Sequence, residues 1–309
     1  MTKVFINGSS GTTGLRLRER LVERRDVKLL EIDYDARRDP SEIKKYIAAS
    51  DVAFLCLPDD AAIEAVAEAG ETIIIDTSTA HRTLDGWAYG FPELSDSHRA
   101  AIKSSKRVAV PGCHASGFLA LVYPLVKAGL VAPDYPFFCH SLTGYSGGGK
   151  AMIAEYEDAG RAGEYSRPRQ YSFGQKHKHL PEMRAVPGLA YEPVFVPVVE
   201  DFYSGMLVTV PLHTRWLPDK PSMGAIQDVL SAHYGDGGLI RVMPLGLDGY
   251  LDAGGLSGRD DMEIYVTGTD ERVVLAARFD NLGKGASGAA LQCFNLIVGA
   301  DESEGLIIA

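Results

Sequence analysis

Cys113 is the residue of this chain whose position most directly suggests chemistry. It follows the β-branched run Val108–Val110 and the pair Pro111-Gly112, and a helix-compatible apolar stretch begins just beyond it. A cysteine at such a strand-to-helix turn faces the positive end of a helix dipole, which favours the nucleophilic thiolate. We therefore expect Cys113 to be a covalent nucleophile rather than one more small buried residue.

Imidazoles that could exchange protons lie at His177, at His179 and at His114, beside the cysteine. An imidazole titrates near neutral pH and suits general acid–base work. Pro181 favours an extended conformation just before it, and on an extended segment His177 and His179 would point to opposite faces. Only one of them would then reach the site. A His-x-His metal site is the alternative, but no second ligand cluster accompanies it, so we expect no metal.

A glycine-rich loop joins the first predicted strand, Lys3–Asn7, to a predicted helix, Leu15–Arg24. Glycines let the backbone approach a pyrophosphate, and the helix N-terminus supplies N–H donors and partial positive charge. The spacing GxxGxxG differs from GxGxxG, but the strand and the helix are where the mechanism needs them. The predicted cofactor-binding residues of this loop are Gly8, Ser10, Gly11, Thr12, Thr13 and Gly14.

The residues after the second predicted strand, Val27–Ile32, bear on which dinucleotide binds. An acid holding the ribose hydroxyls would indicate NAD, and Glu31, Asp33 and Asp35 are available. Arg37-Arg38 could instead pair with a 2′-phosphate, although such arginines can also be a solvated pair. We favour NADP, with Arg37 and Arg38 as its phosphate partners.

A second glycine-rich segment, Gly144–Lys150, ends in a lysine before a predicted helix. It lacks the P-loop spacing, so we interpret it as a flexible cradle for phosphate or nicotinamide, with an ordinary loop as the alternative. Guanidinium groups bind carboxylates and phosphates bidentately, which makes arginines candidates for holding the substrate. The expected residues here are Gly147 for the cofactor and Ser146, Lys150, Arg82 and Arg99 for the substrate.

The elements that must position these residues fall into two groups. Up to Gly112, apolar strands alternate with helices, including a helix capped by Asp59-Asp60 that stops at Gly70, which predicts a doubly wound, Rossmann-type parallel sheet. Further on, strands separated by long irregular stretches predict an α+β domain with a mostly antiparallel sheet. These strands are Phe137–Thr143, Met206–Leu212, Arg241–Pro244, Met262–Thr267 and Val273–Asp280, with a helix at Met223–Tyr234.

The last helical run, Ala286–Val298, is strongly apolar, and we expect it to return to the first domain. The predicted NADP-binding domain is therefore residues 1–112 together with 285–309. Residues 113–284 form the second predicted domain, and the family resemblance given below implies that it is the catalytic and dimerisation domain.

Composition excludes several classes of partner. The net charge of −10 over 309 residues argues against nucleic acid, and no apolar run is long enough for a transmembrane helix. The four cysteines are scattered, with no CxxC pair and no signal peptide before them. We therefore expect a cytoplasmic protein in a reducing environment that acts on small molecules.

The chain resembles N-acetyl-γ-glutamyl-phosphate reductases of the shorter type over nearly its whole length. The order and spacing of several motifs carry this resemblance. They are the glycine loop, Asp76-Thr-Ser-Thr-Ala-His-Arg82, Tyr89-Gly-Phe-Pro-Glu-Leu94, Pro111-Gly-Cys113, Gly144-Tyr-Ser-Gly-Gly-Gly-Lys150, Lys176-His-Lys-His-Leu-Pro-Glu182 and Asp280-Asn-Leu-Gly-Lys-Gly-Ala286.

This resemblance implies NADPH-dependent reduction of an acyl phosphate to a semialdehyde, with release of phosphate, in arginine biosynthesis by a homodimer or homotetramer. It implies Cys113 as nucleophile, His179 as acid–base residue, and Ser78 and Asn281 as cofactor contacts. The family commonly has Cys-Tyr-Pro-Thr where this chain has Cys113-His-Ala-Ser116, which makes His114 a rival base.

Two alternatives stay open. One is a related enzyme with another acyl group, such as an aspartate-semialdehyde dehydrogenase. The other is a non-catalytic dinucleotide sensor, which would not need both Cys113 and the His179 motif.

Overall fold

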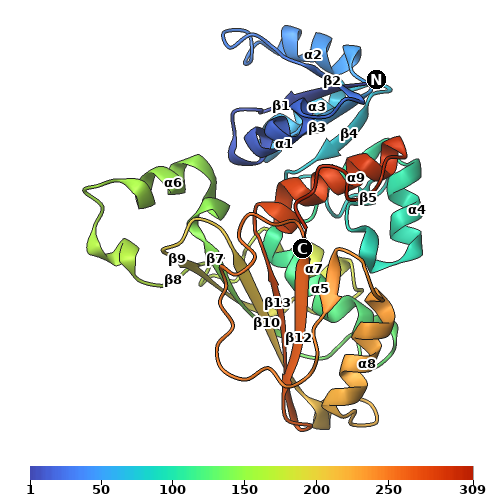
Figure 1. The fold of residues 1–309 in the computed structure, drawn as a ribbon, viewed down its shortest axis with the longest axis vertical. Helices are drawn as coiled ribbons and strands as arrows, with labels where there is room; N and C mark the ends of the chain where they lie inside the picture. The colour runs from blue at the N-terminus through green and yellow to red at the C-terminus, as the bar shows by residue number, and fades with distance from the viewer. Residues whose placement is uncertain (309) are drawn as a thin grey trace. The chain divides into compact units, whose positions relative to one another are not determined.

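A computed structural model describes residues 1–308, and their contacts form two compact units. Unit 1 comprises Met1–Gly112 and Ala286–Leu306, and unit 2 comprises Cys113–Gly285 with the residues from Ile307 onward. Figure 1 shows both units, with the chain coloured from blue to red. Unit 1 is thus built from two separate stretches of the sequence.

Unit 1 is a six-stranded, all-parallel sheet with the strand order β2-β1-β3-β4-β6-β5. Its strands are β1 (Thr2–Asn7), β2 (Val27–Leu30), β3 (Val52–Leu55), β4 (Ile73–Asp76), β5 (Ala88–Tyr89) and β6 (Arg107–Ala109). Its helices are α1 (Thr12–Val22), α2 (Pro40–Ala49), α3 (Asp59–Ala67), α4 (Asp96–Ser104) and α9 (Gly288–Val298).

Both faces of this sheet are covered, as its nearly continuous apolar strands require. Because successive side chains alternate between the faces, Val4 and Ile6 of β1 join the core beneath α1, α4 and α9, whereas Phe5 joins the core beneath α2 and α3. The predicted doubly wound fold is therefore confirmed for this unit.

The C-terminal helix α9 belongs to the core of unit 1 and lies beside α4 (Figure 1). Phe294 of α9 packs with Phe54, their ring centroids 5.7 Å apart. The buried Arg24 guanidinium donates to the amide oxygen of Asn295, and the amide nitrogen of Asn295 donates to two backbone carbonyls beyond the helix. The C-terminal helix is thus tied to the turn between α1 and β2 by a polar contact as well as to β3 by burial.

Two details of unit 1 differ from the sequence expectations. Helix α1 begins at Thr12, earlier than predicted, so the glycine loop runs directly into it. Asp59 is not the cap of α3, because Pro58 occupies that position and the Asp59 carboxylate instead accepts hydrogen bonds from the backbone and hydroxyl of Thr79. Asp59 therefore links the loops that follow β3 and β4.

Unit 2 is a seven-stranded mixed sheet with the order β11-β12-β13-β10-β7-β9-β8, in which antiparallel pairings predominate. Its strands are β7 (Phe138–Gly144), β8 (Arg169–Gln170), β9 (Val194–Glu200), β10 (Met206–His213), β11 (Ile240–Val242), β12 (Met262–Gly268) and β13 (Arg272–Phe279). Its helices are α5 (Cys113–Lys127), α6 (Gly149–Glu157), α7 (Leu180–Ala185) and α8 (Met223–Tyr234).

Helices α5 and α8 pack on one face of this sheet (Figure 1). The approach of α5 is close, since a Cβ on Gly117 would lie only 2.5 Å from a methyl carbon of Val208. On the other face, alternate residues of the central strands stay partly exposed, among them His140, Leu142 and Leu207. The sheet therefore has one closed face and one open face.

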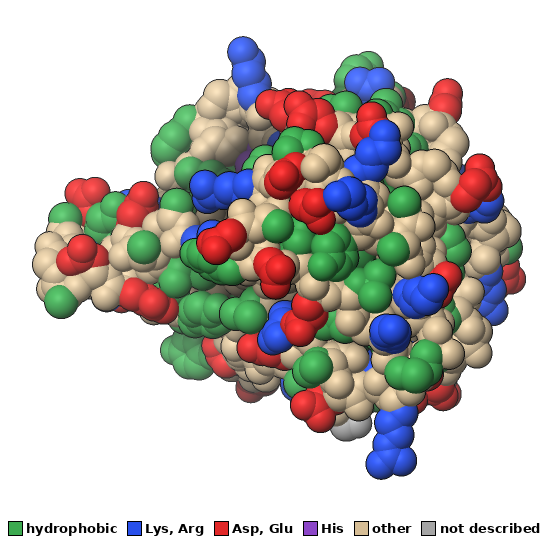
Figure 2. Space-filling view, turned by 90° about the horizontal axis from the view of Figure 1, so that it is seen from above, with side chains coloured by type: hydrophobic (Ala, Val, Ile, Leu, Met, Phe, Trp, Pro, Cys, Tyr) green, Lys and Arg blue, Asp and Glu red, His purple; other side chains and the backbone are tan. Residues whose placement is uncertain are grey.

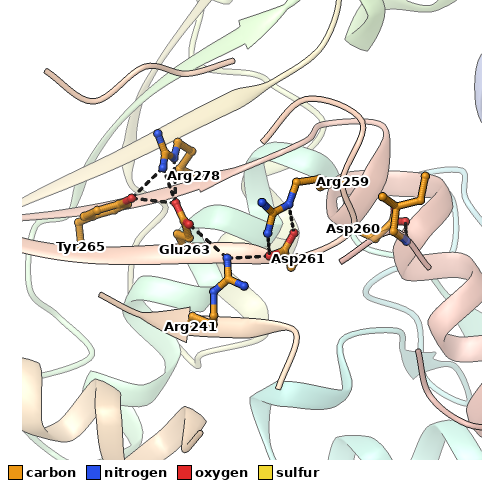
Figure 3. A network of polar contacts seen from close by, with 8 residues as sticks. Arg241, Arg259, Asp260, Asp261, Glu263, Tyr265 and Arg278 are labelled. Carbon is orange, nitrogen blue, oxygen red and sulfur yellow. Dashed lines mark hydrogen bonds and ion pairs between the residues drawn. The ribbon is translucent and has the colours of Figure 1, made fainter. Parts of the chain in front are cut away.

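The open face also carries a row of charges across three strands. Glu263 of β12 lies between Arg241 of β11 and Arg278 of β13 in the strand register, and Figure 3 shows the contacts that join them. Burial raises the pKa of Glu263, but the hydrogen bonds and charges of Arg278, Tyr265 and Arg241 outweigh it and hold this pKa below its usual value. The row is a fixed ion-pair network.

Candidate active site

Cys113 is the first residue of α5, the fourth residue after the end of β6 and directly after Pro111-Gly112. The predicted strand-to-helix position is therefore confirmed. The thiol is partly exposed. A Cβ on Gly285 would lie 2.9 Å from the Cβ of Cys113, so only a glycine allows this approach of the loop after β13. The cysteine thus lies at a helix N-terminus and is closely packed against the loop that contains Gly285.

The other cysteines lie in surroundings that do not favour a nucleophile. Burial raises the pKa of the Cys56 thiol to about 12, and burial also raises the pKa of Cys139. Cys293 is buried in α9, where its Sγ donates to the carbonyl of Gly90. Within residues 1–308 no disulfide joins any of the four. Cys113 therefore remains the best candidate, because a thiolate is the reactive form.

Three histidines of unit 2 form one cluster. The rings of His177 and His179 lie 4.7 Å apart between centroids, and each is within 5.5 Å of the His114 ring. The expectation that His177 and His179 point to opposite faces is therefore wrong. The chain is not extended there, since His179 has φ −90° and ψ −10° and caps α7, whose first turn tolerates Pro181.

His114 is the buried member of this cluster and has both ring nitrogens engaged. Its Nδ1 lies 2.7 Å from Oγ of Ser141, and its Nε2 lies 2.8 Å from the hydroxyl of Tyr171. Burial, aided by the nearby charges of His177 and Lys178, lowers the pKa of His114 to about 3. A histidine held neutral near pH 7 is poorly suited to exchange protons, which weighs against His114 as the acid–base residue.

The second glycine-rich segment and the loop after β13 meet in unit 2. The amide nitrogen of Asn281 donates to Oγ of Ser146 at 3.0 Å, while its amide oxygen accepts from the backbone N–H of Gly205 at 2.9 Å. Gly147 and Lys150 are exposed on the same segment. The structure therefore brings together Asn281 and Ser146, two residues that the sequence analysis proposed separately.

The glycine loop of unit 1 has the geometry that phosphate binding needs. Gly8 has φ +88°, and a Cβ there would lie 2.3 Å from the carbonyl oxygen of Cys56. A Cβ on Gly14 would lie 2.3 Å from the carbonyl oxygen of Gly8. Gly11 caps α1 without a side-chain hydrogen bond, and the buried Thr12 hydroxyl has no hydrogen-bond partner among the described residues. The backbone N–H groups at the start of α1 and the Thr12 hydroxyl are donors that fit a dinucleotide pyrophosphate.

The residues after β2 make two contacts that the sequence analysis did not predict. Glu31 is paired with Arg18 of α1, a residue that the sequence analysis missed because the two are distant in sequence. The Arg37 guanidinium lies over the Tyr34 ring, 3.2 Å from its centroid, and its Nη1 is buried with no hydrogen-bond partner among the described residues. Arg38 is exposed beside it. A basic group that could take a phosphate is therefore present.

A buried Asp–His pair that begins at the last residue of β4 was also not predicted from the sequence. Asp76 accepts hydrogen bonds from the backbone and the hydroxyl of Ser78, and its Oδ2 lies 2.6 Å from Nδ1 of His81. The His81 ring stacks on Trp87, with 4.1 Å between centroids. This arrangement fixes Ser78 at the carboxyl end of the sheet, where doubly wound folds bind their ligands.

The two arginines proposed for the substrate are engaged within unit 1. Arg82 donates to the backbone carbonyls of Val110 and Thr77. Arg99 forms an ion pair with Glu302, which raises its pKa. Arg99 thereby holds the C-terminal segment against α4.

Two classes of site are not seen in the described part of the chain. No group of three or more His, Cys, Asp or Glu residues among residues 1–308 is arranged to hold a metal ion. None of the helices described is long and apolar enough to cross a membrane. On the face drawn in Figure 2, acidic and basic side chains are interspersed, so that face carries no extended region of one charge.

Comparison with known proteins places this chain in a family. The family model described as "Semialdehyde dehydrogenase, dimerisation domain" matches residues 113–281. The fold is shared with aspartate semialdehyde dehydrogenase II from Vibrio cholerae, with a TM-score of 0.72 and 16% identity over 97% of this chain and 98% of that one. An aspartate semialdehyde dehydrogenase from Francisella tularensis has the same TM-score and identity over 96% of this chain and all of that one. The fold is thus that of the semialdehyde dehydrogenases.

The sequence relatives are more specific. N-acetyl-gamma-glutamyl-phosphate reductase from Brucella ovis is 44% identical over 96% of this chain and 99% of its own length. The protein of that name from Brucella anthropi is 45% identical over 96% of this chain and 98% of its own. The chain therefore belongs to the N-acetyl-gamma-glutamyl-phosphate reductase family.

Proposed function

We propose that this protein reduces N-acetyl-γ-glutamyl phosphate to N-acetylglutamate 5-semialdehyde with NADPH, in arginine biosynthesis. The observation that carries the proposal is the placement of Cys113 at the start of α5, in the same unit as the cluster of His114, His177 and His179. A nucleophile and imidazoles in one unit are what an acyl transfer through a covalent intermediate requires.

In the proposed reaction, the Cys113 thiolate attacks the acyl carbon, and the bond from that carbon to the phosphate oxygen breaks. Phosphate leaves with the electron pair of that bond, and a thioester forms on Sγ. When bound, the reduced cofactor supplies a hydride to the thioester carbon. The resulting thiohemiacetal loses Cys113 as thiolate and gives the aldehyde.

We assign the proton transfers to His179. It would receive the proton of the Cys113 thiol before attack and give that proton to the oxygen of the thiohemiacetal anion. It would take the proton back as the C–S bond breaks, so that the aldehyde forms and Cys113 leaves as thiolate. The backbone N–H of His179 donates to Nδ1 of His177, so His177 orients the turn that carries His179. His114, held neutral between Ser141 and Tyr171, supports the cluster without changing its protonation.

The cofactor residues that we propose lie in both units. In unit 1, the glycine loop would hold the pyrophosphate, with Gly8 and Gly14 allowing close approach and Thr12 donating its hydroxyl. Arg37 and Arg38 would bind the 2′-phosphate, which favours NADP over NAD. In unit 2, Asn281 and Gly147 would contact the nicotinamide.

We infer the identity of the substrate's acyl group from the N-acetyl-gamma-glutamyl-phosphate reductase family to which the chain belongs. An N-acetylated substrate needs a pocket that accepts a neutral amide, whereas a free α-amine needs a carboxylate partner. A pocket built for one rejects the other strongly, because a polar group would be left unpaired. The test is the reverse reaction, reduction of NADP⁺ with phosphate present. N-acetylglutamate semialdehyde should support turnover, and aspartate semialdehyde should give little; the opposite preference would contradict the assignment.

We also propose that two copies associate through the open face of the unit 2 sheet. Its apolar side chains Phe138 and Val194 lie directly opposite each other and are 38% and 55% exposed, and Val196 and Leu207 are partly exposed on the same face. Apolar residues gathered on one open face are typical of association surfaces. The thiol chemistry fits a reducing compartment, so we propose that the protein acts in the cytoplasm.

A further inference from the structure

A pocket of about 120 Å³ lies beside the glycine loop of unit 1. Ser9 of that loop, Arg18 of α1 and Glu31 line it together with apolar residues from the ends of β1 and β2. In parallel-sheet dinucleotide domains the adenosine ribose binds near the end of the second strand. The pocket is therefore where a ribose and any group on its 2′ position would lie.

The polar wall of this pocket is an ion pair. Nε of Arg18 donates to Oε1 of Glu31 at 2.8 Å, and Nη2 of Arg18 donates to the same oxygen. The two side chains are 42% and 59% exposed, so a ligand can reach both. The pair thus offers a carboxylate that could accept from ribose hydroxyls and a guanidinium that could donate to a phosphate.

We propose that Arg18 and Glu31 together set the selectivity of this chain for the 2′ position of its dinucleotide. Arg18 donates to the 2′-phosphate, and Glu31 competes with that phosphate for the same guanidinium. Glu31 also accepts from the 2′-hydroxyl when no phosphate is present. This inference rests on the proposed function, because it needs a dinucleotide on the glycine loop.

The charges support opposite effects for the two residues. A guanidinium gains a second anionic partner when phosphate enters, whereas Glu31 places a negative charge beside the incoming dianion. Arg37 lies over Tyr34, and Arg38 follows it on an exposed turn. Neither lines the pocket, so we expect both to add to the binding of the 2′-phosphate from outside it. Removing the Arg18 charge should weaken phosphate binding, and removing the Glu31 charge should strengthen it.

The test is the affinity of the full chain for 2′,5′-ADP and for 5′-AMP, measured by isothermal titration calorimetry. These two fragments share the adenosine end and differ in the 2′-phosphate. Arg18→Gln should weaken 2′,5′-ADP roughly 10- to 100-fold, the loss expected for a charge-assisted hydrogen bond, and leave 5′-AMP nearly unchanged. Glu31→Gln should tighten 2′,5′-ADP several-fold and weaken 5′-AMP.

Arg25→Gln is the matched control, because Arg25 is an exposed arginine in the turn after α1 that does not line the pocket. It should leave both affinities unchanged. Arg18→Lys keeps the charge and loses the planar fork, so it should weaken 2′,5′-ADP less than Arg18→Gln does. Circular dichroism confirms that each variant is folded.

The outcomes separate this inference from the proposed cofactor. If the unchanged protein prefers 2′,5′-ADP and neither Arg18→Gln nor Glu31→Gln changes the ratio of the two affinities, the inference is overturned and NADP stands. If the unchanged protein prefers 5′-AMP or binds neither fragment, the NADP assignment fails, and the inference fails with it.

Discussion

The imidazole rings of His177 and His179 lie 4.7 Å apart at an interplanar angle of 84°, and the backbone N–H of His179 donates to Nδ1 of His177. This contact gives the two histidines different tasks. A ring nitrogen that accepts from the backbone holds its ring in place, which suits His177 to positioning and leaves the proton transfers to His179.

Replacing His179 with Asn should lower kcat by roughly 10²- to 10⁴-fold, the usual contribution of a general acid–base residue, and flatten the pH profile near neutrality. His177→Asn should reduce kcat less and preserve the shape of the profile. The pH dependence of kcat for both variants is the measurement. A flat profile in His177→Asn with a normal one in His179→Asn would reverse the assignment.

Local signals in the sequence predicted the glycine loop and the position of Cys113 correctly, because each depends on a few adjacent residues. The histidine pair was mispredicted because Pro181 also fits the first turn of a helix, and the rule for the residue before a proline does not choose between the two. The packing of α7 on α5 selects the helical conformation over the extended one, and α5 lies outside the motif.

Other features were missed for identifiable reasons. Strand β9 contains Pro197, which breaks the usual pattern of a central strand. Helix α2 was not assigned, although Asp39 accepts from the backbone of Ser41 and Pro40 follows as the first helical residue, a readable start signal. The pairing of Arg18 with Glu31 depends on the docking of α1 beside β2, which no local pattern specifies.

The buried His114 should make the protein less stable in acid. Its pKa is about 3 in the folded state, lowered first by burial, against an ordinary value of 6.5. The unfolded chain therefore takes up a proton as the pH falls below about 6.5, while the folded chain does not, and stability decreases with falling pH. At pH 5 the expected loss from this residue is about 2 kcal/mol.

His114→Gln removes that titration. The variant should be less stable than the unchanged protein at pH 7, because it loses hydrogen bonds to Ser141 and Tyr171, but it should lose less stability between pH 7 and pH 5. The free energy of unfolding from urea titrations at both pH values is the measurement. An equal loss in both proteins would show that His114 does not resist protonation.

Replacing Arg37 and Arg38 together with Ala should raise KM for NADPH much more than KM for NADH, because the lost charges would face only the 2′-phosphate. Steady-state kinetics with both cofactors measure this difference. If the unchanged enzyme uses NADPH and NADH equally well, the reason for assigning these arginines to the phosphate disappears.

A carboxylate on the open face of the unit 2 sheet should prevent self-association. Val196→Glu places a charge opposite His140, where a single protomer can solvate it, whereas a covered interface cannot. Sedimentation equilibrium should give an oligomer for the unchanged chain and a monomer for this variant. Tyr250→Glu, at a fully exposed loop position, is the control and should leave the mass unchanged. A monomeric unchanged chain would contradict the proposed association, and an oligomeric Val196→Glu variant would place the interface elsewhere.

The acylation of Cys113 tests the central claim most directly. The protein is incubated with N-acetylglutamate 5-semialdehyde and NADP⁺ without phosphate, so that the oxidised acyl group stays on sulfur, and is then analysed by peptide mass spectrometry. We expect NADPH to form in a burst and an N-acetylglutamyl group to be found on the peptide that carries Cys113. Phosphate should clear this adduct, and Cys113→Ala should form neither product while still binding cofactor. An adduct on Cys56, Cys139 or Cys293, or turnover by Cys113→Ala, would contradict the account.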